Sequence, residues 1–301
     1  MDKKVVVVII NYNGKADTIA CLESVFRTQY PSYEILIVDN GSQDGSTEEL
    51  QRRFPSVFIV KNPDNRGFAV AGNQGASIAR KNGADYVFFL NNDAVVAPDT
   101  IGLLIDAAER DKSIGAIGPL ILYTGTGERV WFVGGLIDWK RGIWQHVEKN
   151  MYEKDGTCDV DAISGCALMV KSSVLSVCGL FDERFFLYGE DVDLCVRIRG
   201  CGFRVVCLTA GKVWHKVGAT IGGSGSPQYL YYITRNRLLF MKKYAKPSNW
   251  IFFAPYFIYS QTRECIRYIR ERRGGSAHSI ISGIGDFLLG KFGPREQKGK
   301  V

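Results

Sequence analysis

The chain has 301 residues, of which 46% are hydrophobic, and it carries a net charge of +7. This length and apolar fraction suffice for one large α/β domain or for two small ones. The eight cysteines include no C-x-x-C pair, which excludes the usual zinc spacing, and they lie in apolar surroundings. We therefore expect free buried thiols in a reducing compartment rather than a disulfide framework.

The first 111 residues alternate between strand and helix patterns. Val5–Ile10 is a continuous apolar run rich in β-branched residues, typical of a strand buried on both faces. Further strands are predicted over 34–39, 57–61 and 86–90, and helices over 16–28, 46–54, 69–82 and 98–111. Such a βαβ series predicts an α/β fold with a mostly parallel central sheet and helices on both faces. The opening run is also too short for the core of a signal peptide, so we expect a cytoplasmic protein.

The rest of the chain has a different pattern. Short strands with glycine turns are expected over 117–147, and amphipathic helices over 228–244 and 250–272. Residues 274–301 are rich in glycine, and we expect them to be loosely ordered.

Polar residues follow the first two predicted strands. The first strand ends in Asn11-Tyr12-Asn13 and the second in Asp39-Asn40-Gly41. In parallel sheets, ligands bind beyond the carboxyl ends of the strands. Asp39 could accept a hydrogen bond from a ribose hydroxyl or a base N–H, and Gly41 would let the backbone approach a ligand closely. The alternative is that these residues only form turns.

A third polar segment, from Asn65 to Asn73, opens a predicted helix whose free N–H groups suit an anion. No G-x-G-x-x-G follows the first strand, and no G-x-x-x-x-G-K-[ST] occurs in the chain. The sequence therefore disfavours a dinucleotide-binding fold and a P-loop ATPase.

The strand at 86–90 ends in Asn91-Asn92-Asp93, which is a candidate metal site. A departing diphosphate needs its charge neutralised, and a divalent ion held by carboxylates and phosphate oxygens commonly does this. Only Asp93 in this triplet is a carboxylate, so a second ligand is needed, and His215 is the best candidate among three histidines. The alternative is that His215 is purely structural.

A second acidic site lies further along the chain. Glu190-Asp191 follows the aromatic run Phe185–Tyr188 at the predicted start of a helix. Acidic residues are favoured in a first helical turn, so these two could simply stabilise the helix. A metal-type carboxylate at a strand end, together with a candidate base on a later helix, is nevertheless the arrangement of an enzyme.

In their order along the chain, the segments at 11–13, 39–42, 65–68, 91–93 and 189–191 resemble those of glycosyltransferase family two. The chain is most similar to the rhamnosyltransferase branch, which also carries segments like Ser164–Val170 and Tyr231–Arg237. The resemblance runs from about Val5 to Phe240 and implies an inverting enzyme of GT-A fold. We expect a catalytic domain over 1–225, with a nucleotide-binding half (1–115) and an acceptor half (116–225), followed by a helical extension over 226–301.

The resemblance also implies roles for individual residues. Asp191 corresponds to the general base, with Glu190 as its catalytic neighbour, and Asp93 and His215 would hold Mg²⁺ or Mn²⁺ on the diphosphate. Asn stands at 91 and 92, whereas the family has a D-x-D motif there. The implied donor-binding residues are Asn11, Tyr12, Asn13, Asp39, Asn40, Gly41, Asn65, Gly67, Phe68, Asn73, Asn91, Asn92 and Asp93. The implied acceptor-binding residues are Ser164, Gly165 and Cys166, and Arg235 is the implied diphosphate-binding residue.

Inversion needs only one carboxylate to accept the proton of the acceptor hydroxyl, while its oxygen attacks the anomeric carbon opposite the diphosphate. Glu190 and Asp193 lie close to Asp191 in sequence, so we expect them to raise its pKa towards the working range. The favoured reaction is the transfer of rhamnose from dTDP-rhamnose to a hydroxyl of a cell-surface or lipid-linked glycan. A UDP-sugar donor, a nucleotidyltransferase and a non-catalytic carbohydrate-binding relative are the alternatives.

The C-terminal segment from Ser226 carries fourteen basic and four acidic residues, a balance of +10 that leaves −3 for the first 225 residues. The apolar block Trp250–Tyr259 is too short and too interrupted by proline to span a bilayer. With the arginines behind it, this block predicts a helix lying on an anionic membrane surface, so that the protein would be peripheral on the inner face of the membrane. The alternative is a helix packed on the catalytic domain. Nucleic-acid binding is disfavoured because the aromatic residues do not interleave with basic ones.

Overall fold

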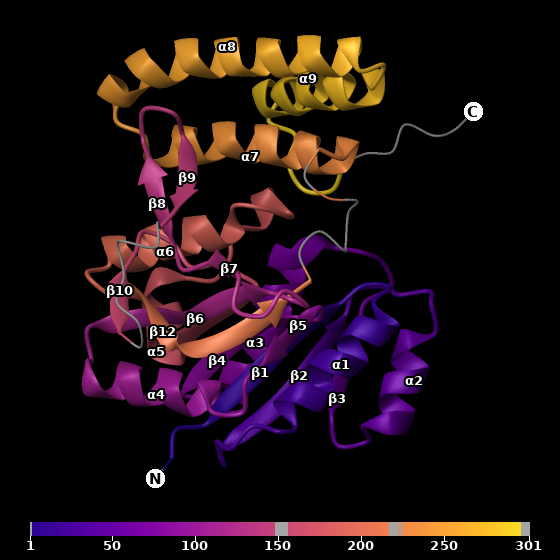
Figure 1. The fold of residues 1–301 in the computed structure, drawn as a ribbon, viewed down its shortest axis with the longest axis vertical. Helices are drawn as coiled ribbons and strands as arrows, with labels where there is room; N and C mark the ends of the chain where they lie inside the picture. The colour runs from indigo at the N-terminus through magenta and orange to yellow at the C-terminus, as the bar shows by residue number, and fades with distance from the viewer. Residues whose placement is uncertain (1, 148–155, 217–222, 224, 296–301) are drawn as a thin grey trace. The chain divides into compact units, whose positions relative to one another are not determined.

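A computed structural model describes residues 2–147, 156–216, 223 and 225–295. The chain divides into two compact units (Figure 1). The sheet unit comprises Met1–Leu136, His146–Phe181 and Asp191–Val217, and the helical unit comprises Ile137–Gln145, Asp182–Glu190 and Gly218–Val301. This division differs from a cut at residue 225, because two internal segments group with the C-terminal helices.

The sheet unit is built around a mixed sheet. The expectation of a mostly parallel sheet is right for its first half and wrong for its second half, which is largely antiparallel. The strands of the first half are parallel and occur in the order β4-β1-β2-β3, comprising β1 (Val5–Asn11), β2 (Tyr33–Asp39), β3 (Phe58–Lys61) and β4 (Tyr86–Asn91). β1 is buried along almost its whole length, as its unbroken apolar sequence predicts.

The second half of the sheet continues beyond β4 in the order β11-β6-β12-β10. These strands are β6 (Ile114–Tyr123), β10 (Thr157–Asp159), β11 (Ala167–Lys171) and β12 (Arg204–His215). β11 is antiparallel to both β4 and β6, whereas β12 is parallel to β6. Two short strands, β5 (Ala94–Val96) and β7 (Val130–Phe132), pair with β12 and β6.

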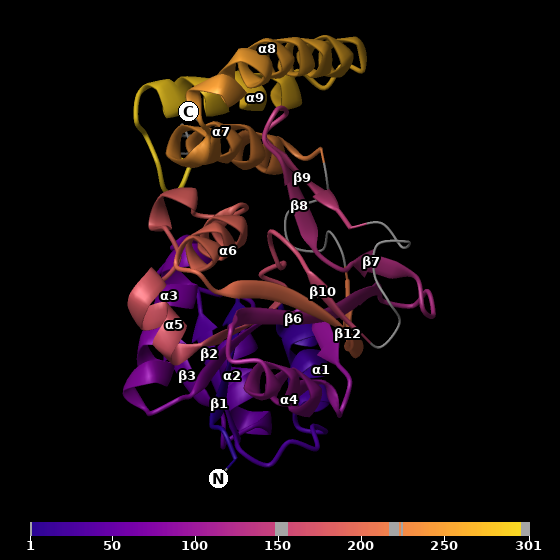
Figure 2. The ribbon, with the colours of Figure 1, turned by 90° about the vertical axis from the view of Figure 1, so that its left-hand side faces the viewer.

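Helices cover both faces of this sheet (Figure 2). The residues Val5, Val7 and Ile9 share one core with the helices α1 (Lys15–Val25), α2 (Ser46–Arg53) and α4 (Thr100–Arg110). On the other side are α3 (Gly67–Lys81), α5 (Ser172–Cys178) and α6 (Glu190–Gly200). α3 approaches β1 very closely, because a Cβ at Gly75 would lie 2.3 Å from a Val8 methyl group.

The helical unit contains three helices and a β-hairpin. The helices are α7 (Pro227–Tyr244), α8 (Pro247–Arg270) and α9 (Gly274–Leu288), the hairpin strands are β8 (Gly135–Asp138) and β9 (Ile143–His146), and a short 3-10 helix, η2, spans Glu183–Phe185. α7 begins with a Ser226 cap and a proline in its first turn, which are favourable N-terminal features. α9 packs along α7 and α8, and a Cβ at Gly283 would lie 2.7 Å from the Tyr231 carbonyl oxygen.

Two expectations can be compared directly with this architecture. The expected loose order of 274–301 is wrong for Gly274–Leu288, which forms α9, while residues 296–301 lie outside the described part of the chain. The expectation of thiols rather than disulfides is confirmed for the described residues, but burial is not general, since Cys201 is exposed. Within the described residues, no helix is both long and apolar enough to cross a bilayer.

Candidate active site

The register of the parallel strands brings three predicted site residues together. Asn11 is the partner of Asp39 across β1 and β2, and Ile10 is the partner of Asn91 across β1 and β4. The last residues of three adjacent strands therefore lie in one row at the carboxyl edge of the sheet, where ligands bind in folds of this class.

Asn11 is the centre of a buried hydrogen-bond cluster at this edge. Its Nδ2 donates to Asp39 Oδ2 at 2.7 Å and to Ser46 Oγ at 2.8 Å. Its Oδ1 accepts from Thr18 Oγ1 at 2.8 Å. Asp39 Oδ1 also accepts from the Ser42 amide at 3.0 Å. The carboxylate of Asp39 is thus held in one orientation, which suits it to accept hydrogen bonds from a ligand.

Asn40 connects this cluster to the loop before α3. Its Nδ2 donates to Asn65 Oδ1 at 3.0 Å and to the Gly67 carbonyl at 3.2 Å, and its Oδ1 accepts from the Arg66 amide. Gly41 has a φ of +84°, and a Cβ there would lie 2.7 Å from the Asp64 backbone. Only glycine fits at this position without displacing the neighbouring loop.

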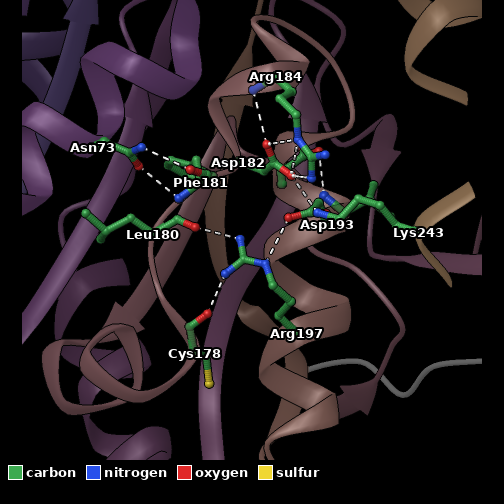
Figure 3. A network of polar contacts seen from close by, with 11 residues as sticks. Asn73, Cys178, Leu180, Phe181, Asp182, Arg184, Asp193, Arg197 and Lys243 are labelled. Atoms are coloured by element: carbon green, nitrogen blue, oxygen red, sulfur yellow. Dashed lines mark hydrogen bonds and ion pairs between the residues drawn. The ribbon is translucent and has the colours of Figure 1, made fainter. Parts of the chain in front are cut away.

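The remaining donor-side residues differ in their accessibility. Tyr12 is 40% exposed, and Asn13 has a left-handed φ of +51° with its Oδ1 accepting from the Gln43 amide at 2.7 Å. The Asn73 amide makes two hydrogen bonds with the Phe181 backbone, at 2.8 and 3.0 Å (Figure 3). These bonds give Asn73 a structural role in holding the chain at Phe181, and its expected donor-binding role stays a prediction.

Asp93 and His215 form the predicted pair of metal ligands. Asp93 Oδ1 lies 3.1 Å from His215 Nε2, and both side chains are more than 90% buried. β5 and β12 cause this proximity, because His215 pairs with Ala94. Apart from this contact, Asp93 Oδ1 has no hydrogen-bond partner among the described residues, and neither has His215 Nδ1, the ring nitrogen that does not face Asp93. A buried carboxylate and an imidazole side by side suit a divalent ion, although no group of three or more potential His, Cys, Asp or Glu ligands occurs in the described residues.

The two asparagines before Asp93 have different surroundings. Asn92 Nδ2 donates to Thr18 Oγ1 at 3.0 Å and lies 3.4 Å from Asn11 Oδ1, so it belongs to the cluster around Asn11. The backbone amide of Asn91 donates to the backbone carbonyl of Cys166 at 2.9 Å. Asn92 therefore connects the donor-side cluster with the Asp93 region.

Asp191 lies at the start of α6, beside the turn Ser164–Cys166. Its Oδ2 accepts from the Gly165 amide at 2.8 Å, and its Oδ1 accepts from the Val192 amide at 2.8 Å. Burial raises the pKa of Asp191, and these hydrogen bonds oppose the rise. Burial is thus the leading cause, rather than the like charges of Glu190 and Asp193 that the sequence suggested.

The turn 164–166 lies close to the Asp191 carboxylate and to the end of β4. Burial raises the pKa of the Cys166 thiol, and the charges of Asp93 and Asp191 both contribute to this rise. The ring of Phe68, in the first turn of α3, and the side chain of Asp191 would both lie 3.5 Å from a Cβ placed at Gly165. The candidate base is therefore a direct neighbour of the predicted acceptor turn.

Asp193 has a structural role within α6. It is fully buried and pairs with Arg197 Nε at 2.9 Å. The same guanidinium donates to the carbonyls of Cys178 and Leu180 (Figure 3). Together with Asn73, Arg197 fixes the chain just before Asp182.

Glu190 and Arg235 belong to the helical unit. Glu190 is 5% exposed, and it contributes, after burial and Tyr229, to the raised pKa of Tyr188. Arg235 is fully buried, and its guanidinium donates to the backbone carbonyls of Arg184, Phe185 and Gly293. Because its N–H groups are engaged inside the protein, Arg235 does not fit the expected role of binding a diphosphate.

The sequence did not point to Thr18 or Trp131. Thr18 links Asn11 with Asn92, and the ring of Trp131 packs on His215 with centroids 4.8 Å apart. Thr18 lies one turn into α1 and carries no motif, so its role depends on the fold. Trp131 reaches His215 through the β6–β7 pairing, which the sequence pattern did not specify.

Comparison with known proteins decides the family. Residues 6–176, more than half of the chain, match the model of glycosyl transferase family 2. The chain belongs to this family. It is 30% identical to N-acetylglucosaminyl-diphospho-decaprenol L-rhamnosyltransferase of Mycobacterium tuberculosis over 208 residues, which are 62% of this chain and 68% of that protein. It is 27% identical to the O-antigen biosynthesis protein RfbC of Myxococcus xanthus over 75% of this chain and 18% of that protein.

Solved structures show the same fold. GalNAc-T7 with UDP, GalNAc and Mn²⁺ superposes with a TM-score of 0.65 and 21% identity, over 80% of this chain and 48% of that one. The mannosyltransferase PcManGT of Pyrobaculum calidifontis, in complex with GDP-Man and Mn²⁺, gives a TM-score of 0.58 and 15% identity, over 96% and 76%. These similarities confirm the GT-A fold, and the family identifies the chain as a glycosyltransferase that uses a nucleotide-sugar donor.

Proposed function

We propose that this glycosyltransferase inverts the anomeric centre as it transfers rhamnose from dTDP-rhamnose to a hydroxyl of a polyprenyl-linked glycan. The observation that carries this proposal is the pair of contacts made by the turn 164–166. The Gly165 amide donates to Asp191 Oδ2 at 2.8 Å, and the Cys166 carbonyl accepts from the amide of Asn91, two residues before Asp93, at 2.9 Å. Asp93 would then serve the diphosphate and Asp191 the acceptor. The relative from Mycobacterium tuberculosis, whose name specifies a rhamnosyl donor and a decaprenol-linked acceptor, supports the choice of substrates.

The donor nucleotide would bind at the carboxyl edge of β1 and β2. Asp39 is held there by Asn11 and by the Ser42 amide, so its carboxylate needs no reorganisation to accept from a ribose hydroxyl or a base N–H. Gly41 keeps the neighbouring backbone free of a side chain, and Tyr12 offers a partly exposed ring at the same edge.

The residues present fit a divalent ion, Mg²⁺ or Mn²⁺. Asp93 Oδ1 is buried without a hydrogen bond and lies 3.1 Å from His215 Nε2, so both would serve as ligands. Diphosphate oxygens and water would complete the coordination, as is usual for such ions. When bound, the ion would neutralise charge on the leaving diphosphate.

Asp191 would act as the general base. Its carboxylate accepts the proton of the acceptor hydroxyl as that oxygen bonds to the anomeric carbon, and the bond from this carbon to the diphosphate oxygen breaks. The Gly165 and Val192 amides hold the carboxylate in place, and burial raises its pKa, which makes it a better proton acceptor. The nucleoside diphosphate leaves with the electron pair of the broken bond.

The helical unit also carries a surface that suits a membrane. α8 exposes an apolar stripe, defined by Ile251, Phe252, Ile258, Tyr259, Ile266 and Ile269, all at least 45% exposed. Helical spacing places these residues on the side opposite Phe253 and Phe257, which are buried. Exposed Arg263 and Arg270 lie beside the stripe, so an anionic lipid surface complements it in both charge and polarity. This supports a peripheral protein on the inner face of the membrane that carries the acceptor.

Product analysis with isotope-labelled donors tests the reaction. Labelled dTDP-rhamnose and UDP-sugars are each incubated with the protein, a divalent metal and a short-chain polyprenyl-diphospho-N-acetylglucosamine. Release of dTDP, with rhamnose found on the lipid, supports the proposal. Release of UDP from a UDP-sugar would change the donor, release of pyrophosphate would indicate a nucleotidyltransferase, and binding without product would indicate a non-catalytic relative.

A further inference from the structure

The loop before Glu190, in the helical unit, has an unusual backbone. Phe186 and Tyr188 have left-handed φ values of +62° and +69°, followed by Gly189 at +94°. Bulky residues rarely adopt this conformation, and it persists only where surrounding contacts enforce it. The loop ends at Glu190, which precedes Asp191 directly.

Asn236 of α7 engages three carbonyls of this loop. Its Nδ2 lies 2.8 Å from the Phe185 oxygen, 2.8 Å from the Leu187 oxygen and 2.7 Å from the Tyr188 oxygen. Its Oδ1 accepts from Arg235 Nε at 3.1 Å, which fixes which end of the amide faces the loop.

Arg235 completes the set of contacts. One terminal nitrogen donates to the carbonyls of Arg184 and Phe185, at 3.1 and 3.0 Å, and the other donates to Gly293 at 2.8 Å. The guanidinium carbon lies 5.3 Å from the Tyr231 ring centroid and 5.1 Å from that of Tyr232. The Phe186 ring stacks on Tyr232, with centroids 5.1 Å apart, so the left-handed residue is held by its side chain as well.

We infer that Arg235 and Asn236 are positioning residues for Glu190, the neighbour of the proposed base. Asn236 contacts the carbonyls of 185, 187 and 188, and one terminal nitrogen of Arg235 contacts those of 184 and 185, so together they hold the loop in a conformation it would not adopt alone. The loop in turn sets where Glu190 lies. This inference rests on the proposed function only for the catalytic role of Glu190. It also explains the Tyr231–Arg237 segment, whose aromatic pair encloses the arginine.

A matched pair of variants separates loop positioning from general stability. Arg237 lies two residues beyond Arg235 on α7, is 9% exposed, and donates to the carbonyls of Arg141 and Gly142 instead of the loop. Arg235→Lys and Arg237→Lys are therefore the same chemical change. The first removes contacts to the loop 184–188, and the second removes contacts to Arg141 and Gly142. Asn236→Asp is the third variant, because it keeps the side-chain shape but replaces the donor by a carboxylate.

The first measurement is peptide-resolved amide hydrogen exchange, which needs no substrate. Arg235→Lys and Asn236→Asp should each accelerate exchange in 184–190 by at least about tenfold, since hydrogen bonds that oppose local opening are lost. Arg237→Lys should accelerate exchange in 139–145 and leave 184–190 unchanged. Wild-type exchange of 184–190 in both loop variants would overturn the inference.

The second measurement separates turnover from donor binding. In the loop variants, kcat for rhamnosyl transfer should fall about tenfold to a hundredfold, as expected for a misplaced catalytic group, while the Kd for dTDP in calorimetry stays unchanged. A wild-type kcat in a variant whose loop has opened, or an equal loss of kcat in Arg237→Lys, would overturn the positioning role.

If both loop variants fail to fold while Arg237→Lys folds, Arg235 and Asn236 serve folding and the inference is also wrong. If wild-type protein transfers no sugar, the proposed function fails, and the exchange data still decide whether the pair holds the loop.

Discussion

The Asp93 carboxylate faces the His215 imidazole, with 3.1 Å between Oδ1 and Nε2. These residues lie far apart in the sequence, and the antiparallel pairing of β5 with β12 brings them together. Trp131 packs on the imidazole. In the function that we propose, this carboxylate and this histidine serve where the family resemblance leads us to expect a D-x-D motif.

Removing either residue of this pair should abolish the benefit of the metal for donor binding. Asp93→Ala or His215→Ala should weaken dTDP-rhamnose binding in Mn²⁺ by at least about tenfold, because the ion stabilises the diphosphate. In excess chelator, the variants and the wild type should bind alike. His146→Ala is the matched control, since His146 also contacts Trp131 but lies on the exposed side. Metal-independent donor binding and turnover by the wild type would show that Asp93 holds no ion.

Replacing the base should separate chemistry from stability. Asp191→Asn should lower kcat by roughly 10²–10⁴-fold, the usual contribution of a general base, and leave donor binding unchanged. The melting temperature should change little, because the single amide oxygen keeps only one of the hydrogen bonds from Gly165 and Val192, while the removal of a buried charge offsets the loss of the other. Asp193→Asn should behave in the opposite way, lowering the melting temperature through loss of the ion pair with Arg197. Normal turnover by Asp191→Asn would exclude it as the base, and Glu190 would be the next residue to replace.

The raised pKa of Asp191 also predicts two pH dependences. Since the base must be deprotonated, kcat should rise with pH through the folded-state pKa of Asp191, which lies above the ordinary pKa of an aspartate. The folded protein holds this proton more tightly than the unfolded chain does. Its contribution to stability is therefore present below the unfolded pKa and is lost as pH rises through the folded pKa. The free energy of unfolding, measured by denaturant titration, should therefore fall between acidic and neutral pH by more in the wild type than in Asp191→Asn. The same pH dependence of this free energy in both proteins would contradict the prediction.

Most of the fold was predictable because buried strands and amphipathic helices have strong periodic patterns. The predicted strand 34–39 and helix 228–244 agree with β2 and α7 within one residue at each end. Gly274–Leu288 could not be predicted as a helix, since its glycines have low helix propensity. Contact with α7, where Gly283 lets the two backbones approach, supplies the missing stability.

The candidate site was predictable only in part. Strand-end residues such as Asn11 and Asp39 follow from the parallel half of the sheet, because the carboxyl ends of β1 to β4 share an edge. The roles of Asn73 and Arg235 depend on which backbone segment packs against each side chain, and no local sequence pattern specifies this. Both side chains carry N–H donors, and the sequence cannot tell whether such a donor binds an anion or a backbone carbonyl.

The contacts of Asn73 lead to a prediction about stability rather than catalysis. Asn73→Ala should lower the free energy of unfolding by about 1–3 kcal/mol, because the Phe181 amide and carbonyl lose their partners in a partly buried place. Donor affinity should remain close to that of the wild type. Urea titration and calorimetry with dTDP measure the two effects, and a large loss of affinity in a stable variant would support the donor-binding role.

The apolar stripe on α8 predicts binding to anionic membranes. Full-length protein should sediment with vesicles containing phosphatidylglycerol at low salt and be partly released at high salt, because each basic residue near the surface contributes about 1 kcal/mol to binding.

Removing everything after Pro247 is a poor test of this prediction, since it would uncover the face of α7 that packs on α9. Ile258→Glu with Ile269→Glu is better, because both side chains are more than 60% exposed and no buried contact is lost. Val177→Glu is the matched control, because the Val177 side chain is exposed on α5 of the sheet unit, and this variant should bind vesicles normally. If the double variant binds as tightly as the wild type, the stripe does not insert into the membrane, and a lipid-linked acceptor would have to reach the enzyme by another route.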